Sequence, residues 1–452
     1  MQMFKKALTA RTAILAAAVV VILLAQAPFF KTHTNIDYDT GSVVSAIDHC
    51  LVMPGQFDVD RVPGSPSYIL VSAAFIFWFR KLAGAVGSRE ILWGASVVMS
   101  WLCLFTFYRR SKQVVGNYWV QGLMLLALGL HPIFFWHTFS AIEDMFAFFC
   151  FALTLSMLRR PGLDRLAWII FATGVSSKLS LFGLFPLALA FHLRQDRGTD
   201  LLSLGRQIVE PVMIVVLTSV LLILPAAAHF AMDPAQMFYT DNYGTVFSQR
   251  FEVGWFLTRA TILWWVPFGV YLIVEHIIRW VKERKVSLIE MADIPILLVF
   301  VACLKPMFVL NWIIAAVSLI VIALYYLKAR GNADREFQFA KAFLITFSIP
   351  LSIVFIMLAS YSRSFVLFAL VPLLYGMSLR CRSVAVWVLI AAISFLSMFH
   401  YVQVTGRRVV IHQFGYYEAF LKGMNNYFND YGFVDDAARQ TEIPLLPVRG
   451  DN

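Results

Sequence analysis

Long apolar blocks constrain this chain more than any other feature of its sequence. Stretches of roughly 20 residues with few charged side chains recur from residue 11 to residue 402. Such a block matches the thickness of the hydrocarbon core of a bilayer. In lipid it must be a helix, because its backbone groups find no water to bond. The sequence therefore predicts an all-α polytopic membrane protein and argues against a soluble enzyme with a single anchor.

We expect about 13 transmembrane helices of this kind. The expected spans are residues 11–30, 88–108, 118–138, 142–158, 164–178, 179–193, 207–228, 255–279, 288–304, 307–327, 340–359, 364–379 and 383–402. The apolar segment Ser67 to Ala83 is expected to lie at the interface instead. The expected domains are a transmembrane module over 1–402, with interfacial helices in its first outer loop (31–87), and a short outer tail over 403–452.

The distribution of basic residues sets the expected orientation. The chain has 37 Lys and Arg and a net charge of +10, and most of these residues fall on one side if the N-terminus is inside. Arg80, Lys81 and Arg89 are exceptions to this pattern. If Ser67 to Ala83 crossed the membrane, every later loop would change sides and the bias would reverse. Because the basic residues are scattered between spans, no nucleic-acid partner is expected.

Other sequence signals narrow the class further. The five cysteines include no CxxC pair and imply no disulfide framework. The N-terminus has a basic start and a long apolar core, which favours an uncleaved first helix over a signal peptide. The sequence has no Walker loop, no GxGxxG after a strand and no HExxH motif, so ATP-driven transport and zinc proteolysis are not favoured. The absence of an Asn-x-Ser/Thr sequon fits a bacterial source, so we expect a bacterial inner (plasma) membrane.

The stretch Asn35 to Tyr68 carries five aspartates, although only 14% of the residues in the chain are charged. Asp37 and Asp39 stand where the chain has just left the bilayer, a place where a spanning helix needs no carboxylate. A membrane protein that handles a cation, a proton or a sugar hydroxyl does need one. The structural alternative is that Asp39 caps a helix from Val43 to Leu51.

Further charged residues stand at the expected outer ends of later spans. Glu143 and Asp144 begin the fourth span, near His137, and either form a second carboxylate site or only favour a helix N-terminus. Lys178 interrupts an apolar run at a costly depth, which points to an anionic partner or to snorkelling at the interface. Arg363 is the same case as Lys178, much later in the chain. Arg61 is a further outer cation, explained equally well by a lipid headgroup or by a substrate.

Three segments resemble the GT-C superfamily of integral-membrane glycosyltransferases, in the branch of protein O-mannosyltransferases and lipid A aminoarabinose transferases. The first pairs Asp39-Thr-Gly-Ser with Arg61-Val-Pro-Gly-Ser-Pro-Ser-Tyr68. The others are HPIFFWHTFSAIEDMFAFFCFALTL and ATGVSSKLSLFGLFPLAL, so the likeness covers roughly residues 35–195. Many members have Asp-Glu at the first site, whereas this chain has Asp39-Thr40 with Asp37 two residues earlier. Which aspartate takes the key position, and whether a metal binds, both stay open.

This resemblance implies an inverting transfer of a sugar from a polyprenyl-phosphate donor to a glycan, lipid or protein acceptor at the outer face. Asp39, supported by Asp37, would be the base, because the acceptor hydroxyl must lose its proton. Cations would hold the leaving phosphate. The remaining expected roles are catalysis for Asp144, substrate binding for Arg61, Tyr68, His137, Glu143, Lys178 and Arg363, and a Mg²⁺ or Mn²⁺ ion, if any, between Asp39 and Asp144.

Two other classes of function fit parts of this sequence. A transporter or flippase for an anionic lipid-linked glycan would line a path with its cations, and vesicle transport without sugar transfer would identify it. The sequence shows no midplane pair of broken helices of the kind such carriers use. A structural protein without chemistry leaves the outer carboxylates and Lys178 unexplained.

Overall fold

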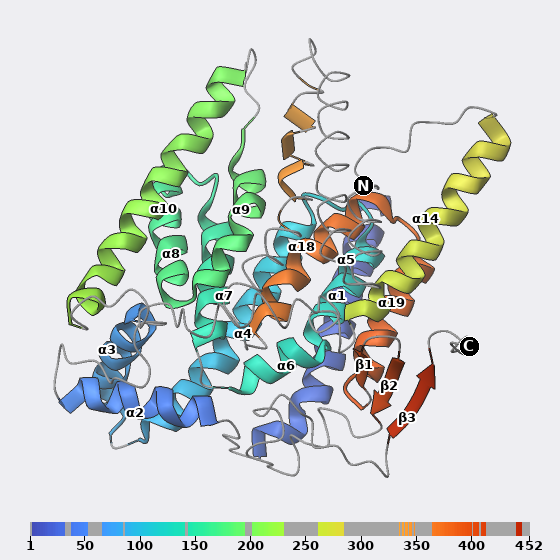
Figure 1. The fold of residues 1–452 in the computed structure, drawn as a ribbon. Helices are drawn as coiled ribbons and strands as arrows, with labels where there is room; N and C mark the ends of the chain where they lie inside the picture. Colours follow the sequence, from blue (N-terminus) through green and yellow to red (C-terminus); the bar gives the residue numbers. More distant parts are fainter. Residues whose placement is uncertain are drawn as a thin grey trace, which may run out of the picture.

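The computed structural model of this protein describes residues 2–31, 38–52, 66–84, 86–140, 143–194, 201–229, 261–283, 364–399, 401–405, 408–412 and 440–444, with scattered positions between 334 and 348. The expected spans 288–304 and 307–327 lie outside the described residues, and so does most of 340–359. Figure 1 shows a bundle of helices with a small sheet beside one end.

Helices make up nearly all of the described chain. They are α1 (Gln2–Gln26), η1 (Ala27–Lys31), α2 (Tyr38–Val52), α3 (Pro66–Ala83), α4 (Ser88–Ser111), α5 (Tyr118–Gly129), α6 (Pro132–Phe139), α7 (Glu143–Met157), α8 (Asp164–Ser177), η2 (Leu179–Leu184), α9 (Phe185–His192), α10 (Leu201–His229), α14 (Thr261–Glu283), α18 (Ser364–Arg380) and α19 (Val384–Leu396). The expected helical fold is therefore present wherever these segments are described.

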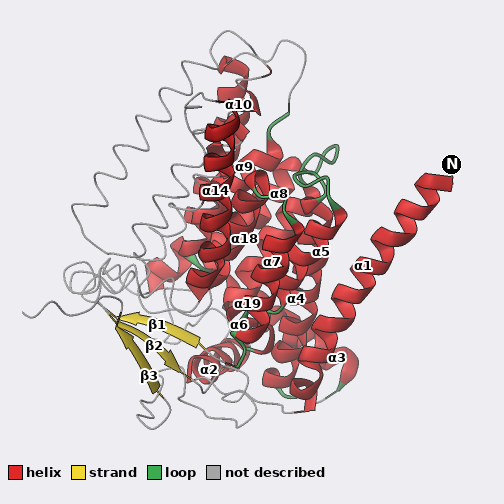
Figure 2. Cartoon of the chain, turned by 90° about the vertical axis from the view of Figure 1, so that its right-hand side faces the viewer, coloured by secondary structure: helices red, strands yellow, loops and turns green. Residues whose placement is uncertain are grey.

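Successive helices run back and forth between two ends of the bundle (Figures 1 and 2). One end, called here the Lys178 end, holds α2, α3, α6 and the start of α7. The other, called the Arg159 end, holds the last residues of α4, α7 and α9 and the start of α8. Lys178 makes the turn between α8 and the η2–α9 segment, so the expected spans 164–178 and 179–193 are two separate passes.

Small residues allow the helices of the bundle to approach closely. A Cβ atom added to Gly174 of α8 would lie 2.8 Å from Cβ of Cys150 and 3.2 Å from the carbonyl oxygen of Ala147, both on α7. A Cβ atom on Gly129 of α5 would lie 2.5 Å from Cδ1 of Ile22 on α1. Close backbone packing of this kind supplies the van der Waals contacts that hold helices together where lipid surrounds them.

The expected span 118–138 is a bent pair of helices. The axes of α5 and α6 differ by 60° across the break at Leu130 and His131. Pro132 begins α6 and has no N–H to continue the ladder of α5. The side chain of His131 instead accepts a hydrogen bond from the N–H of Ile133 at 3.3 Å, which caps α6.

Helices α2 and α3 lie across the Lys178 end. The hydroxyls of Ser67, at the start of α3, and Ser176, at the end of α8, are hydrogen-bonded. At the other end of α3, Nη2 of Arg80 donates to the hydroxyl of Ser88 at 2.7 Å, at the start of α4. Since α8 ends and α4 begins at the same end of the bundle, both ends of α3 are fixed there. Helix α2 begins at Tyr38, five residues before the expected start at Val43. Residues Asp39 to Ser42 therefore belong to its first turns and do not precede it.

A small apolar core joins these two helices to the bundle. Val43, Ile47, Ile69, Ile76 and Ile91 are fully or nearly buried in it. They come from α2, α3 and α4, so side chains far apart in the sequence share one core. Each buried aliphatic side chain contributes about 1.5–3 kcal/mol when it leaves water, which holds the aspartate-bearing helix α2 against α3 and α4.

Among the described residues, two helices are long and apolar enough to cross a membrane, and the bent α5–α6 pair would make a third. They are α4 and the stretch Gly205–Leu224 of α10. The expectation of about 13 spans exceeds this number, because α8, α9 and α19 are short and several expected spans are not described. The outward side chains of α10 are apolar, among them Val209, Met213 and Leu221, and such a face suits lipid.

A three-stranded antiparallel sheet departs from the all-α expectation. It consists of β1 (Tyr401–Thr405), β2 (Arg408–His412) and β3 (Gln440–Pro444) in the order β1-β2-β3. Tyr401 pairs with His412, and Arg408 pairs with Pro444. YVQVT alternates valine with polar residues, and RVVIH has three β-branched residues in succession. Both compositions favour strands, but a search for long apolar runs does not detect them. The first strand begins two residues before the expected tail, 403–452.

We expect Gly174→Ala to destabilise the protein by about 1–3 kcal/mol, because the added methyl group must displace α7 from α8. The measurement is the midpoint of thermal unfolding of the purified protein in detergent. Gly94→Ala in α4 is the matched control, since a Cβ atom there meets nothing within 4 Å. Equal midpoints for the two variants would contradict the close approach of α7 and α8.

Candidate functional site

Four segments bring charged and polar side chains together at the Lys178 end. Glu143 and Asp144 occupy the first turn of α7, where the sequence EDMFAFF turns from acidic to apolar. Lys178 follows the last residue of α8, and His137 lies in the last turn of α6. Tyr68, in the first turn of α3, packs its ring against Phe146 of α7 with the ring centroids 5.4 Å apart. The sequence predicted all of these as site residues except Phe146.

Lys178 is the centre of the cluster. Its Nζ lies 3.1 Å from Oε1 of Glu143 and 3.4 Å from Oδ1 of Asp144. The Lys178 side chain is 19% exposed, whereas those of Glu143 and Asp144 are 6% and 3% exposed. The Lys178 side chain is therefore the most exposed member of this ion-pair group, and the two carboxylates that contact its ammonium are buried.

The backbone explains why Lys178 stands at this place. Its N–H donates to the carbonyl of Gly174 at 2.9 Å and ends α8, and its own carbonyl accepts from Leu181 at 3.0 Å and begins η2. The residue itself is extended, with φ −152° and ψ 104°. A cation at the end of α8 and two acids at the start of α7 also complement the dipoles of those helices. The alternative that these charges only stabilise the ends of their helices is therefore consistent with the same contacts.

His137 adds a titratable ring on the far side of Asp144. Its Nδ1 lies 3.8 Å from Oδ2 of Asp144, and both side chains are almost completely buried. This separation is longer than a hydrogen bond. Asp144 therefore stands between an ammonium on one side and an imidazole on the other, and the protonation of that imidazole changes the net charge of the cluster.

Tyr68 closes the cluster on the side of α3. Its residue is 1% exposed, and its hydroxyl is hydrogen-bonded to Ser72. Burial raises the pKa of the Tyr68 phenol, and the negative charges of Glu143 and Asp144 raise it further. The phenol is accordingly neutral and enclosed by protein in this conformation, where it faces the carboxylates.

With neutral His137 and Tyr68, the described cluster holds two negative charges and one positive charge. Taking such charges out of water is costly, and removing one partner of a buried ion pair typically costs about 3–5 kcal/mol. The cluster is therefore stable only as a unit. Chemically, it can offer a fixed ammonium to an anion that approaches from the surface.

The remaining sequence-predicted site residues are placed less fully. Asp39 is the second residue of α2, inside the helix and not before it, so it is not the residue that precedes a helix beginning at Val43. Asp37, Arg61 and Arg363 lie outside the described residues. Arg363 directly precedes α18 in sequence. Their roles stay predictions.

The described residues do not test the metal prediction, because the side chain of Asp39 is not among them. Within the described part of the chain, no three or more His, Cys, Asp or Glu side chains are grouped so that they could hold a metal ion. A metal between Asp39 and Asp144 therefore stays a prediction.

Sequence analysis did not single out several polar residues that hold the site in place. The Ser67–Ser176 hydrogen bond fixes α3 to α8 two residues before Lys178. The hydroxyl of Ser88 donates to the carboxylate of Asp48 and so fixes α2 to α4. Serines carry little signal in a sequence, because their partners here are at least 40 positions away.

Comparisons with known proteins give little support for a family. No family model matches the chain, and no curated protein matches it. A search of solved structures finds ArnT from Cupriavidus metallidurans in the apo state, with 14% sequence identity and a TM-score of 0.36. The match covers 86% of this chain and 78% of ArnT. At that TM-score the two folds correspond too loosely for a residue or an activity to be carried from one to the other.

We expect Lys178→Met to destabilise the protein by about 3–5 kcal/mol, because it leaves two buried carboxylates without their cation. The readout is again the midpoint of thermal unfolding. Arg165→Gln is the control, since Arg165 forms an exposed pair with Glu210 and should cost less than about 1 kcal/mol. Adding Glu143→Gln to Lys178→Met should restore part of the loss. A Lys178→Met protein as stable as the control would show that the carboxylates do not depend on Lys178.

Proposed function

We propose that this chain is a membrane glycosyltransferase that moves a sugar from a polyprenyl-phosphate donor to an acceptor hydroxyl. The observation that carries the proposal is the position of Lys178. Its partly exposed side chain lies at one end of the bundle, with the ammonium fixed by Glu143 and Asp144. The aspartate-bearing helix α2 lies across that same end (Figure 1). A fixed cation near a carboxylate suits a reaction in which a phosphate leaves as a hydroxyl is deprotonated.

Asp39 is the proposed base. Its carboxylate would take the proton of the acceptor hydroxyl while the hydroxyl oxygen attacks the anomeric carbon of the donor. The bond from that carbon to the phosphate oxygen breaks, the configuration inverts, and polyprenyl phosphate leaves with the bonding electron pair. Asp37, two residues earlier, is the nearest alternative base in the sequence. The acceptor is a glycan, a lipid or a protein.

The cations would stabilise the phosphate as its charge develops. Lys178 is the described member of this set, and Arg61 and Arg363 are its proposed partners. A phosphate is already a good leaving group, so the mechanism needs no general acid. Glu143 and Asp144 would then act mainly through Lys178, and His137 through Asp144, because all three are more deeply buried than the Lys178 side chain. A Mg²⁺ or Mn²⁺ ion between Asp39 and Asp144 is the proposed site if a metal takes part.

The proposed location is a bacterial inner membrane, with the Lys178 end on the outer face. The charge distribution supports this orientation, because Arg109, Arg110, Arg159, Arg160 and Arg194 all lie near the Arg159 end. Positively charged loops remain on the cytoplasmic side of a membrane protein. The first outer loop and the sheet would then share the outer side with Lys178.

We expect Asp39→Asn to lower the rate of sugar transfer by about 10²–10⁴-fold, the usual contribution of a general base. The assay supplies membranes that contain the variant with labelled polyprenyl-phosphate sugar and measures label in acceptors at equal expression. Asp48→Asn is the matched control on the same helix. Asp48 bonds Ser88 and pairs with Arg80, so its role is structural. Undiminished transfer by Asp39→Asn would refute the base, and movement of the intact donor across vesicles without transfer would favour a flippase.

A further inference from the structure

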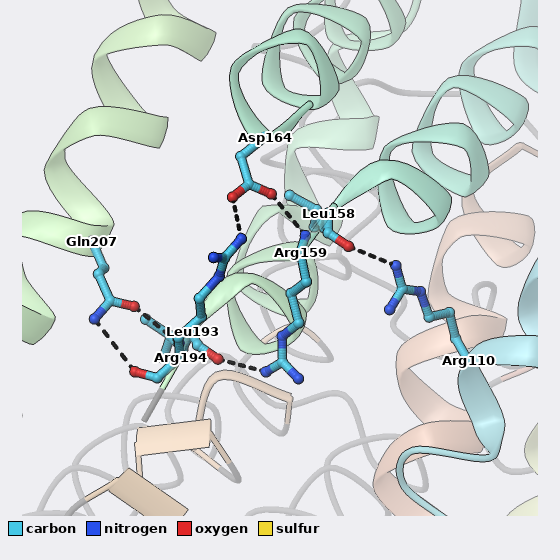
Figure 3. Close-up of polar contacts among 7 residues, drawn as sticks. All are labelled: Arg110, Leu158, Arg159, Asp164, Leu193, Arg194 and Gln207. Atoms are coloured by element: carbon cyan, nitrogen blue, oxygen red, sulfur yellow. Dashed lines mark hydrogen bonds and ion pairs between the residues drawn. The ribbon is translucent and has the colours of Figure 1, made fainter. Parts of the chain in front are cut away.

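The Arg159 end carries a second group of charges, far from the proposed reaction site. Figure 3 shows Arg110, Arg159 and Arg194 there, with Asp164 the one carboxylate among the residues drawn. The three arginines follow or end helices α4, α7 and α9, so three separate passes of the chain place a guanidinium at this end. Lys341 is close enough to Arg159 for their charges to repel. None of these groups has a part in the proposed sugar transfer.

Two of the arginines hold the C-terminal carbonyls of helices. Arg110 donates to the carbonyls of Leu155 and Leu158 at the end of α7, the second at 3.0 Å. Nη2 of Arg159 donates to the carbonyl of Leu193, just after α9, at 2.5 Å. These contacts satisfy carbonyls that a helix end leaves without partners. They do not neutralise the arginines, because a carbonyl carries no net charge.

Arg194 and Asp164 form the one ion pair of this group among the described residues. Nη2 of Arg194 lies 2.5 Å from Oδ2 of Asp164, and Oδ1 of the same carboxylate accepts from the backbone N–H of Arg159 at 2.7 Å. Glu210, the next acid, is paired with Arg165. Among the described residues, Asp164 is thus the acid that contacts this group, and Arg110, Arg159, Arg194 and Lys341 exceed it by three positive charges in that part of the chain.

The excess charge has physical consequences at Arg159. Burial lowers the pKa of its guanidinium, and the neighbouring charge of Arg194 lowers it further. The backbone of Arg159 is also left-handed, with φ 67°, a conformation that costs a residue other than glycine about 1–2 kcal/mol. Position 159 therefore carries an arginine although a glycine would adopt this backbone without strain and although neighbouring cations repel the guanidinium. A bound anion would relieve that repulsion.

The surface along α10 becomes apolar beyond the exposed Arg206 and Glu210 at this end. Gln207 of α10 accepts from the backbone N–H of Arg194 at 2.9 Å, so α10 passes directly next to the arginines. From there Val209, Met213 and Leu217 of α10 are exposed along the helix. A ligand that complements both surfaces has an anionic group at the helix end and an apolar chain along α10, which are the two parts of an anionic phospholipid.

We propose that Arg159 and Arg194 bind the phosphate of an anionic phospholipid, whose acyl chains lie along the exposed face of α10. The side chain of Arg194 is 45% exposed and can be reached from the headgroup region. Guanidinium groups match the geometry of phosphate oxygens and are weakly hydrated, which suits a site at the membrane surface. The proposal does not depend on the sugar-transfer reaction, nor on which leaflet the Arg159 end faces.

Native mass spectrometry of the full-length protein tests the proposal. The protein is released from detergent micelles that contain phosphatidylglycerol or phosphatidylcholine, and the retained lipid is counted. We expect wild-type protein to retain phosphatidylglycerol in preference to phosphatidylcholine. Arg159→Gln with Arg194→Gln should weaken that retention roughly 25-fold, about fivefold for each arginine. Arg89→Gln, an exposed arginine at the opposite end, is the control and should retain lipid normally.

Three results would overturn the proposal. The first is equal retention of phosphatidylglycerol by the wild type and the double variant. That result would show that the arginines bind helix carbonyls and not lipid. The second is retention of both lipids to the same extent. The third is that inorganic phosphate alone stabilises the protein against heat as much as phosphatidylglycerol does, which would make the ligand a free anion. If the double variant does not fold, Arg194→Gln alone leaves the carbonyl contacts of Arg110 and Arg159 intact and should weaken retention about fivefold.

Discussion

The contacts of Lys178 with Glu143 and Asp144 are the interaction on which the Lys178 end of this protein depends. They join the start of α7 to the end of α8, the pair of helices that Gly174 brings into close contact. Each charge offsets part of the desolvation cost of burying the others, since an uncompensated charge at this depth costs several kcal/mol. The same contacts fix the ammonium of the partly exposed Lys178, so stability and the proposed phosphate binding rest on the same atoms.

The described charge clusters at the two ends of the bundle differ in sign. In the cluster around Lys178, two buried acids contact one described cation, and the neutral Tyr68 lies beside them. At the Arg159 end, arginines outnumber the acids and contact the carbonyls that helices leave open. Between the ends the passes are apolar, as a bilayer requires. This separation of charge by end would let one chain carry the proposed reaction site at one end and the proposed lipid-binding site at the other.

Sequence patterns predicted much of this arrangement from local information alone. Apolar runs located α4, α5, α7 and α10, and unexpected charges at their ends singled out Glu143, Asp144 and Lys178 before any contact between them was known. The break at Pro132 and the extent of α2 were missed, because an apolar run has the same appearance whether a helix bends or continues. The strands after residue 400 were missed for a related reason, since β-branched residues also occur in apolar helices.

The sequence by itself determined that this chain is helical and apolar and that its charges gather at helix ends, because composition and run length act locally on each segment. Only the tertiary structure decided that Lys178 meets two acids 34 and 35 positions away, that Tyr68 is enclosed beside them, and that Ser67 fixes α3 to α8. These pairings depend on how separate helices pack in space, and packing is set by small residues such as Gly174 whose effect appears only when a neighbouring helix is in place.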